Sequence, residues 1–273
     1  TLRTALSSFQ TALKDLNDVK LFENRSAKSS STDLLTATAS KTAQSGTYSV
    51  KIEQLATGSK TATAALESDF TTGVAGTLTI KVGDGEGVAV DLGEGASLTQ
   101  VKDALNATLE GSGVTANLLT DPSTGKARLV MSSTNTGEGK DVSITTSAGL
   151  EALAIDTGGA ATAVAGGVLE RAQNAKLTID GLALQSATNK VEGAIPDVAL
   201  DLVSADKDKT VTITVAQDKE GVSANIKKFV TAYLYNQKTN SVTTRQYALA
   251  TTATVTSTSA WADIIKLPAG NTY

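Results

Sequence analysis

Apolar residues recur at helical spacing near both ends of the chain. The set near the start, spaced alternately by four and three residues, is Leu2, Leu6, Phe9, Leu13 and Leu16. The set near the other end, spaced by four, three and four residues, is Val222, Ile226, Phe229 and Tyr233. These residues, called the helical seam below, follow the heptad pattern of helices that pack against other helices. The pattern predicts one helix from Thr1 to about Phe22 and a second between Asp218 and Asn236.

The two predicted helices need partners, because an isolated helix of this length is only marginally stable in water. We expect them to lie side by side in one helical domain, with the chain between them inserted as a separate body. A bundle formed by one chain needs a third helix to bury both apolar stripes. Residues 26–40 could fold as that helix, with Leu34 and Leu35 inward. Alternatively, the seam could pack against another subunit, and the sequence does not decide between the two.

Between the two helices the apolar pattern changes to a period of two. Apolar and polar residues alternate over 48–53 and over 78–82. Alternation with one apolar face is typical of half-buried antiparallel strands. The turn sequence "TDPSTG" at 120–125 joins two such runs and predicts a hairpin. The other short runs predicted as strands, including the two beside this turn, are 114–118, 127–131, 142–144, 177–179, 182–184, 198–202 and 211–215.

One helix is predicted among the strands, in the stretch "SLTQVKDALN" at 97–106. Ser97 can cap it, with Gln100 completing a capping box three residues later. Leu98, Val101 and Leu105 then share one face, which favours burial against a sheet over a partner-binding role.

The predicted fold class is α+β, elongated and multi-domain, with a helical bundle domain built from both chain ends and antiparallel β-rich domains inserted into it. Two flexible, nearly uncharged stretches at 38–46 and 156–167 indicate crossings between bodies. The predicted domains are a helical domain (1–45 plus 217–273), a β-rich middle domain (46–65 plus 169–216), and a β-rich outer domain with one small helix (66–168).

Composition excludes several function classes. The chain has no cysteine and no histidine, which removes disulfides, thiol nucleophiles, Cys or His metal sites and imidazole bases. The net charge of -4 offers no basic surface for nucleic acid. No run approaches the roughly 18 apolar residues of a membrane span. We therefore predict no nucleic-acid or membrane partner, no metal and no cofactor.

Two loops rich in glycine and acids could suggest ligand sites. "GDGEG" at 83–87 and "NTGEGKD" at 135–141 lack the residues of a phosphate loop and the ligand spacing of calcium motifs. We interpret the first as a hairpin loop and the second as a surface loop.

A pair of carboxylates is the main remaining catalytic candidate. A glycosidase needs two acids about 5 to 10 Å apart, and Asp180 with Glu192 or Asp201 could supply them. However, Asp180-Gly181 lies between two alternating runs, where a type I′ hairpin turn requires such a dipeptide. This region also lacks the aromatic residues that commonly line sugar clefts. We predict no catalytic residues and no enzyme activity.

Several stretches, in order along residues 1–233, resemble the flagellar hook-associated protein 2 family, the filament-capping proteins of the bacterial flagellum. Besides the first helix, they are "DLLTATASKTAQSGTYSVKIEQLATGSK" (33–60), "SLTQVKDALNA" (97–107) with "GVTANLL" (113–119), "RLVMSSTNTGEGKDVSI" (128–144), "NAKLTIDGLALQSATNKVEGAIPDVALDL" (174–202) and "VTITVAQDKEGVSANIKKFVTAY" (211–233). The resemblance ends there, because residues 237–273 are rich in threonine and have little heptad order.

The resemblance implies a role in assembly without catalysis. Members of the family form a homo-oligomeric ring, about four to six copies, at the filament tip. The ring retains exported flagellin and promotes its folding and insertion; the helical body contacts the filament end and the β-domains form an outer plate. The implied partners are further copies, flagellin and hook–filament junction proteins. The implied location is extracellular, reached by the flagellar type III route. The family's terminal coiled-coil legs are absent, so the chain looks like a fragment.

An alternative function is a surface adhesin that binds host mucin or glycans through the outer β domain. Its contacts would come from exposed loops such as 83–87 and 135–141, and it could coexist with capping.

Overall fold

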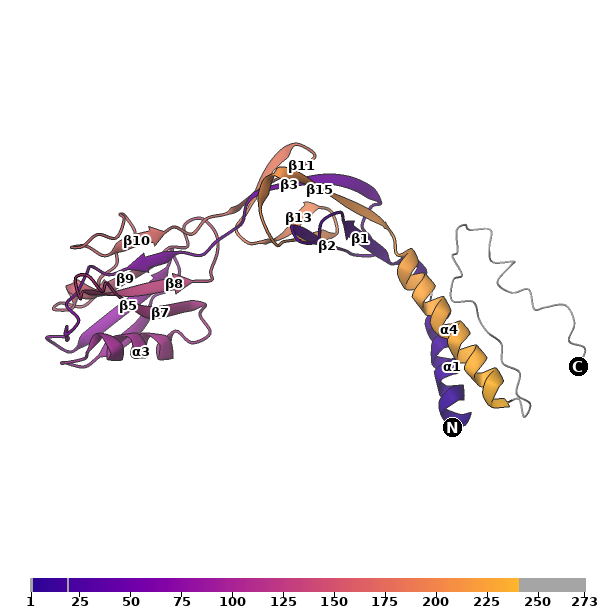
Figure 1. The fold of residues 1–273 in the computed structure, drawn as a ribbon, viewed down its shortest axis with the longest axis horizontal. Coiled ribbons are helices and arrows are strands. Elements are labelled where there is room, and N and C mark those ends of the chain that lie inside the picture. Colours follow the sequence, from indigo (N-terminus) through magenta and orange to yellow (C-terminus); the bar gives the residue numbers. More distant parts are fainter. Residues whose placement is uncertain (1, 19, 241–273) are drawn as a thin grey trace, which may run out of the picture. The chain divides into compact units, whose positions relative to one another are not determined.

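The structure is a computed structural model that describes residues 2–18 and 20–240. It confirms the α+β class, with few helices and many antiparallel strands in several sheets (Figure 1). The chain divides into two compact units, residues 1–17 with 223–273, and residues 18–222. Of the predicted helical-domain segment 217–273, residues 241–273 lie outside the described residues.

The first unit contains the helices expected at the two chain ends. Helix α1 (Leu2–Leu16) and helix α4 (Lys219–Asn240) run antiparallel, side by side (Figure 1). Helix α1 ends earlier than predicted, at Leu16, and a separate short helix α2 (Lys20–Glu23) follows in the second unit. Asn17 and Asp18 stand at the break, and both residue types favour local side-chain hydrogen bonds over a helix interior.

Of the two alternatives left open for covering the seam, a third helix at residues 26–40 is excluded. This stretch forms two strands, β1 (Arg25–Ser29) and β2 (Leu35–Ala39). Threonine and alanine alternate after Leu35, a pattern that suits a strand, and Leu35 is fully buried among other strands. The chain therefore leaves the helical unit at Asn17, whereas the sequence predicted a boundary at 45.

The second unit contains two hydrophobic clusters, and the first is called the middle core below. It lies between a five-stranded sheet of order β1-β15-β3-β11-β12 and a three-stranded sheet of order β13-β14-β2. Because β2 and β3 line the same core, the stretch 38–46 stays within one body and is no crossing between bodies, and only its residues 40–45 form a loop. The strands not yet bounded are β3 (Gly46–Gln54), β11 (Ala175–Ile179), β12 (Leu182–Ser186), β13 (Lys190–Ile195), β14 (Val198–Leu202) and β15 (Asp206–Gln217).

The second cluster, called the insert core below, runs from Leu66 to Ile155. It is built by a four-stranded sheet of order β10-β4-β8-β7, a three-stranded sheet of order β6-β5-β9, and helix α3 (Leu98–Thr108). The strands are β4 (Lys60–Ala62), β5 (Gly76–Val82), β6 (Val88–Leu92), β7 (Val114–Thr120), β8 (Ala127–Ser133), β9 (Val142–Thr146) and β10 (Gly167–Glu170), and a 3-10 turn covers Glu151–Leu153.

Helix α3 forms as the sequence predicts. Ser97 accepts a hydrogen bond from the Gln100 N–H, and the Gln100 side chain accepts one from the Ser97 N–H, which completes the capping box. Leu98, Val101 and Leu105 are buried in the insert core. The helix lies beside β7 (Figure 1).

The limits of the insert core are wider than the predicted 66–168. Strand β4 pairs with β8, and β10 pairs with β4, so residues 60–62 and 167–170 belong to the sheet of the insert core. The division of the second unit into a middle domain (46–65 plus 169–216) and an outer domain (66–168) remains a prediction.

Candidate functional site

The Asp180-Gly181 dipeptide forms the hairpin turn that its sequence predicts. Ile179 pairs with Leu182, and Asp180 and Gly181 have φ angles of 50° and 85°, the left-handed values of a type I′ turn. The Asp180 carboxylate accepts a hydrogen bond from the Ser49 N–H at 2.8 Å, which ties the turn to strand β3. This carboxylate therefore has a structural partner.

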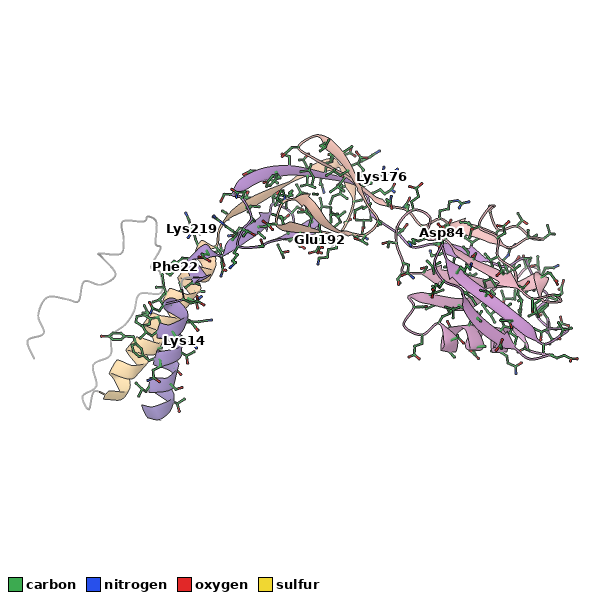
Figure 2. The ribbon with its side chains drawn as sticks, turned by 180° about the vertical axis from the view of Figure 1, so that it is seen from behind. Lys14, Phe22, Asp84, Lys176, Glu192 and Lys219 are labelled. Carbon is green, nitrogen blue, oxygen red and sulfur yellow. The ribbon has the colours of Figure 1, made fainter. Side chains whose placement is uncertain are left out.

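The other two carboxylates of the region belong to one strand pair. Glu192 forms an ion pair with Lys190 at 2.7 Å on the exposed side of β13 (Figure 2). The hydrogen bond and charge of Lys190 lower the pKa of Glu192, and those of Glu192 raise the pKa of Lys190. Asp201 lies opposite Lys190 in the β13–β14 ladder. An ion pair within β13 accounts for Glu192, and cross-strand pairing with Lys190 accounts for Asp201.

The two glycine-rich loops lie where the sequence places them, and they contact each other. Residues 83–87 join the paired strands β5 and β6, and residues 135–141 join β8 to β9. The Gly83 N–H donates to the Asp141 carbonyl at 2.9 Å. Within the described residues, no group of three or more acidic side chains is arranged to hold a metal ion.

Loop 135–141 has a second role that the sequence did not indicate. The Thr136 hydroxyl donates to the Ala187 carbonyl at 2.6 Å, and the Glu138 N–H donates to the Asn174 side chain at 2.8 Å. Ala187 and Asn174 flank strands of the middle core. The loop therefore links the insert core to the middle core through polar contacts.

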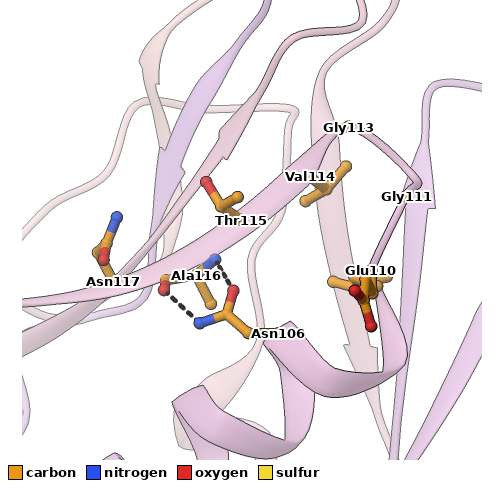
Figure 3. Close-up of a pocket in the computed structure, with 9 residues that line it drawn as sticks. Asn106, Glu110, Gly111, Gly113, Val114, Thr115, Ala116 and Asn117 are labelled. Atoms are coloured by element: carbon orange, nitrogen blue, oxygen red, sulfur yellow. Dashed lines mark hydrogen bonds between the residues drawn. The ribbon is translucent and has the colours of Figure 1, made fainter.

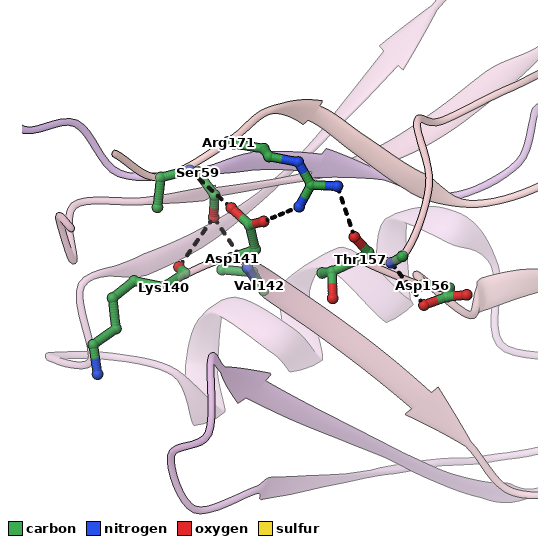
Figure 4. Close-up of polar contacts among 9 residues, drawn as sticks. Ser59, Lys140, Asp141, Val142, Asp156, Thr157 and Arg171 are labelled. Carbon is green, nitrogen blue, oxygen red and sulfur yellow. Dashed lines mark hydrogen bonds and ion pairs between the residues drawn. The ribbon is translucent and has the colours of Figure 1, made fainter. Parts of the chain in front are cut away.

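Asp141, at the end of this loop, binds Arg171 and Ala172, the residues through which the chain passes from the insert core back to the middle core (Figure 4). Its side chain is only 10% exposed and accepts hydrogen bonds from the Arg171 guanidinium at 2.7 Å and the Ala172 N–H at 2.8 Å. Arg171 also donates to the Thr157 carbonyl at 3.0 Å. Ser59 accepts from the Val142 N–H at 3.0 Å. We call the contacts of Ser59, Thr136, Glu138, Asp141 and Arg171 the polar joint.

Replacing Asp141 by alanine is expected to lower the free energy of unfolding by about 1–3 kcal/mol, because the buried Ala172 N–H loses its acceptor. Asp141→Asn keeps an acceptor for this N–H, and it is expected to lower the free energy of unfolding by less. Urea unfolding of both variants and of wild type measures these differences. The exposed Asp84, in the hairpin loop 83–87, gives the control Asp84→Ala, and an Asp141→Ala variant as stable as this control contradicts the prediction.

The β7–β8 turn supplies a pH-dependent contribution to stability. Hydrogen bonds from the side chain and backbone of Ser123 and from the Thr124 hydroxyl lower the pKa of Asp121 from 3.8 to about 2. A lowered folded-state pKa stabilises the fold fully above pH 3.8, and this stabilisation is lost as the pH falls towards 2. Acid titration of unfolding should show wild type losing stability relative to Asp121→Asn over this window. Parallel curves for the two proteins contradict the prediction.

A hollow of about 710 Å³ lies between the end of α3 and strand β7 (Figure 3). One of its walls is the Asn106 side chain, which forms two hydrogen bonds with the backbone of Ala116, at 2.9 and 2.8 Å. The hollow is otherwise lined by Leu109, Glu110, Gly111 and residues 113–117.

The structure brings part of the helical seam together. The Phe9 ring lies 5.5 Å from that of Phe229 and 6.3 Å from that of Tyr233, between ring centres. These separations are typical of favourable aromatic pairs. The seam residues Leu16, Val222 and Ile226 are half-buried. Leu2 lies in α1, but its side chain is not among those described.

Two seam residues of α1 are half-exposed. Leu6 and Leu13 are 49% and 46% exposed, and because they are seven residues apart they lie on the same side of α1. Seam residues therefore remain available on α1 after it packs against α4. No described helix is long and apolar enough to span a membrane.

Three family models match the chain. The model "Flagellar hook-associated protein 2 N-terminus" matches residues 1–59, and "Flagellar hook-associated protein 2 C-terminus" matches residues 172–261. Between them, residues 77–135 match the "Flagellin hook IN motif". The last range covers β5, β6, α3, β7 and β8 of the insert core.

Curated relatives carry the same family name. The A-type flagellar hook-associated protein 2 of Pseudomonas aeruginosa is 44% identical over 245 residues, which cover 85% of this chain and 51% of the relative. The flagellar hook-associated protein 2 of Escherichia coli K12 is 32% identical over 198 residues, 70% of this chain and 41% of the relative. The chain thus spans about half the length of the curated relatives it matches.

Solved structures agree with these relatives. The crystal structure of FliD (HAP2) from Pseudomonas aeruginosa PAO1 is 34% identical, covers 78% of this chain and 99% of that chain, and superposes with a TM-score of 0.67. The flagellar cap protein FliD D1-D2-D3 domains from Escherichia coli are 28% identical, with coverages of 88% and 67% and a TM-score of 0.71. The resemblance in the sequence is confirmed, and the chain belongs to the flagellar hook-associated protein 2 family.

Proposed function

We propose that the protein acts at the tip of the bacterial flagellar filament as a cap, a ring of about four to six copies that retains exported flagellin and promotes its folding and insertion. Membership of a family whose solved members include structures named flagellar cap protein FliD supports this role. The observation in this chain that carries the proposal is the incompletely covered helical seam on α1.

The helical unit is suited to contacts with other helices. Phe9, Phe229 and Tyr233 hold α1 and α4 together, while Leu6 and Leu13 stay half-exposed on one side of α1. Exposed apolar side chains in a row on a helix favour docking against another apolar surface. We assign this side of α1 to contacts with the filament end or with a neighbouring copy.

The proposed mechanism is steric and conformational. A ring of copies encloses a limited space in which an arriving unfolded flagellin can bury apolar surface before it docks. The copies must then shift stepwise as each flagellin inserts, so their mutual contacts should be modest in area and hydrated. No proton transfer or covalent step enters this mechanism, and Asp180, Glu192 and Asp201 are assigned to structural contacts of the turn and strands.

The proposal includes location and partners. The protein would leave the cell by the flagellar type III route and reside outside it, at the filament tip. Its partners would be further copies, flagellin, and the hook–filament junction proteins on which the cap first sits. We do not advance the adhesin alternative, because one of its two candidate loops, 135–141, is engaged by Asn174 and Ala187.

Gold-labelled antibodies against residues 66–168 test the location directly by electron microscopy of intact flagella. We expect label at filament tips of cells that carry the full-length gene, and no label on cells with the gene deleted. Label distributed along the filament shafts, or confined to the cell body, contradicts the proposal.

A further inference from the structure

Two segments, residues 55–59 and 171–174, connect the middle core to the insert core, and they run side by side (Figure 1). They meet at Thr57 and Gln173. The Thr57 N–H donates to the Gln173 carbonyl at 3.0 Å, and the Gln173 N–H donates to the Thr57 carbonyl at 3.1 Å. A ribbon of two strands is marginally stable by itself, because it has no third strand to support it. The connection between the two cores therefore narrows to one pair of residues.

On one side of this pair, both segments are bound to the middle core. The Asn189 side chain donates to the Ala56 carbonyl at 2.9 Å and accepts from the Ala56 N–H at 2.8 Å. On the other segment, the Asn174 carbonyl accepts from the Gln54 side chain at 2.7 Å. Ala56 and Asn174 therefore belong to the body of the middle core.

On the other side of the pair, both segments are bound to the insert core. Gly58 lies against the end of β8, where a Cβ atom would overlap the Ser133 carbonyl. The Ala172 N–H donates to the Asp141 carboxylate at 2.8 Å. Only one residue of each segment thus lies between the restraints of the two cores.

Loop 135–141 makes a further contact between the cores, outside the paired segments. The Thr136 hydroxyl donates to the Ala187 carbonyl at 2.6 Å, and the Glu138 N–H donates to the Asn174 side chain at 2.8 Å. Between them, Gly137 is buried so closely against Ala187 that a Cβ atom there would lie 2.9 Å from the Ala187 Cβ. These three residues of the loop hold the insert core against the turn between β12 and β13.

This contact can separate without exposing a large apolar surface. Among the described residues, no buried apolar side chain belongs to both the insert core and the middle core. Water can replace the hydrogen bonds of the loop at a small net cost. A hollow of about 510 Å³ also borders the loop, lined in part by Thr134, Asn135, Thr136 and, from the middle core, Thr188. The loop therefore has space beside it.

We propose that the Thr57–Gln173 pair is a hinge between the insert core and the middle core, and that residues 136–138 are a latch that holds the hinge closed. When the latch opens, the insert core changes its angle to the middle core while the two segments stay paired. The proposal does not depend on the cap function, since every contact that carries it lies within one chain.

The test measures the distance between two spin labels, one on each core, by electron spin resonance. The chain has no cysteine, so Ala107→Cys on α3 and Ala183→Cys on β12 place labels at two exposed positions alone. We expect one narrow distance distribution in the otherwise wild-type protein, because an open state of about 10% or less contributes little. Adding Gly137→Ala should make a second, broader distribution the larger population, because the new Cβ atom displaces the loop from Ala187.

Two further variants separate the latch from other effects of the substitution. Gly139→Ala is the matched control: Gly139 and Gly137 both have left-handed φ angles, of 79° and 107°, but no atom lies within 4 Å of a Cβ built at Gly139. It should leave the distribution unchanged. Thr136→Val removes the hydroxyl donor without adding a Cβ atom and should also populate the broader distribution, which decides the test if Gly137→Ala does not fold. An unchanged distribution in Thr136→Val and in any folded Gly137→Ala, or an equal change in Gly139→Ala, overturns the proposal.

Hydrogen exchange distinguishes a hinge from unfolding of the insert core. In Gly137→Ala the Glu138 amide should exchange about tenfold faster than in wild type, since it loses its Asn174 acceptor. The Thr57 and Gln173 amides should stay protected, as should the amides of β8. Loss of protection at the Thr57–Gln173 pair or throughout β8 overturns the proposal.

Discussion

Replacing Phe9 by aspartate is expected to separate α1 from α4. Phe9 is the aromatic side chain that contacts both Phe229 and Tyr233, and its loss removes two ring pairs from a helical unit in which few residues are fully buried. A charge placed among apolar rings must also be solvated, which opens the contact. Together these effects should cost the helical unit about 2–4 kcal/mol.

Thermal unfolding followed by the helical circular dichroism signal measures this effect. The matched control is Gln10→Asp, which introduces the same charge at the next, exposed position of α1. We expect Phe9→Asp to lose helical signal at a lower temperature than Gln10→Asp, while the β signal of residues 18–222 unfolds as in wild type because it belongs to the other unit. Unchanged helix melting in Phe9→Asp contradicts the proposed role of the helical seam.

Replacing Gly58 by alanine is expected to destabilise the second unit by about 3 kcal/mol or more. Gly58 lies where the chain enters the insert core, and a Cβ atom there would overlap the carbonyl oxygen of Ser133. Ser133 cannot yield, because it is bound within the β8 sheet, where its N–H donates to the Ser59 carbonyl at 2.9 Å. The conflict is with backbone and cannot be relieved by a rotamer change.

Gly73→Ala is the control for this prediction, since no atom lies within 4 Å of a Cβ built at that position. Urea unfolding should show a large fall in stability for Gly58→Ala and almost none for Gly73→Ala. If Gly58→Ala is as stable as Gly73→Ala, the backbone between β3 and β4 can move to accommodate the added Cβ atom. That result would contradict the prediction and would mean that the polar joint does not hold the two cores in a fixed arrangement.

The features that could be predicted from the sequence have causes within a few residues. The capping box of α3 depends on Ser97 and Gln100, and the turn at Asp180-Gly181 depends on two residues that accept left-handed backbone angles. The aromatic contact between α1 and α4 was indicated by heptad spacing alone. In each case the local chemistry selects one conformation.

The features that were missed depend on partners far along the chain. Residues 25–39 become strands because β15 and β14 pair with them, and neither partner is near in sequence. Short strands such as β4 and β10 have too few residues to show a period. The boundary of the helical unit was misplaced for the same reason.

The polar joint and the contact of Asn106 with strand β7 were also invisible in the sequence. Asp141 and Arg171 are ordinary charged residues until the fold brings them within 2.7 Å. Asn106 occupies the last turn of an amphipathic helix, where an asparagine is unremarkable, and its partner Ala116 is on the following strand.

The proposed function as a filament cap is tested most directly by measuring how much flagellin is in filaments and how much is free in the medium. In cells that lack the full-length gene, we predict that flagellin accumulates as monomer in the medium and that filaments are absent or short. The wild-type gene should restore filaments, the Gln10→Asp gene should do the same, and the Phe9→Asp gene should not. Filaments of normal length in the deletion strain, with no excess flagellin in the medium, would contradict the assignment of this protein as the filament cap.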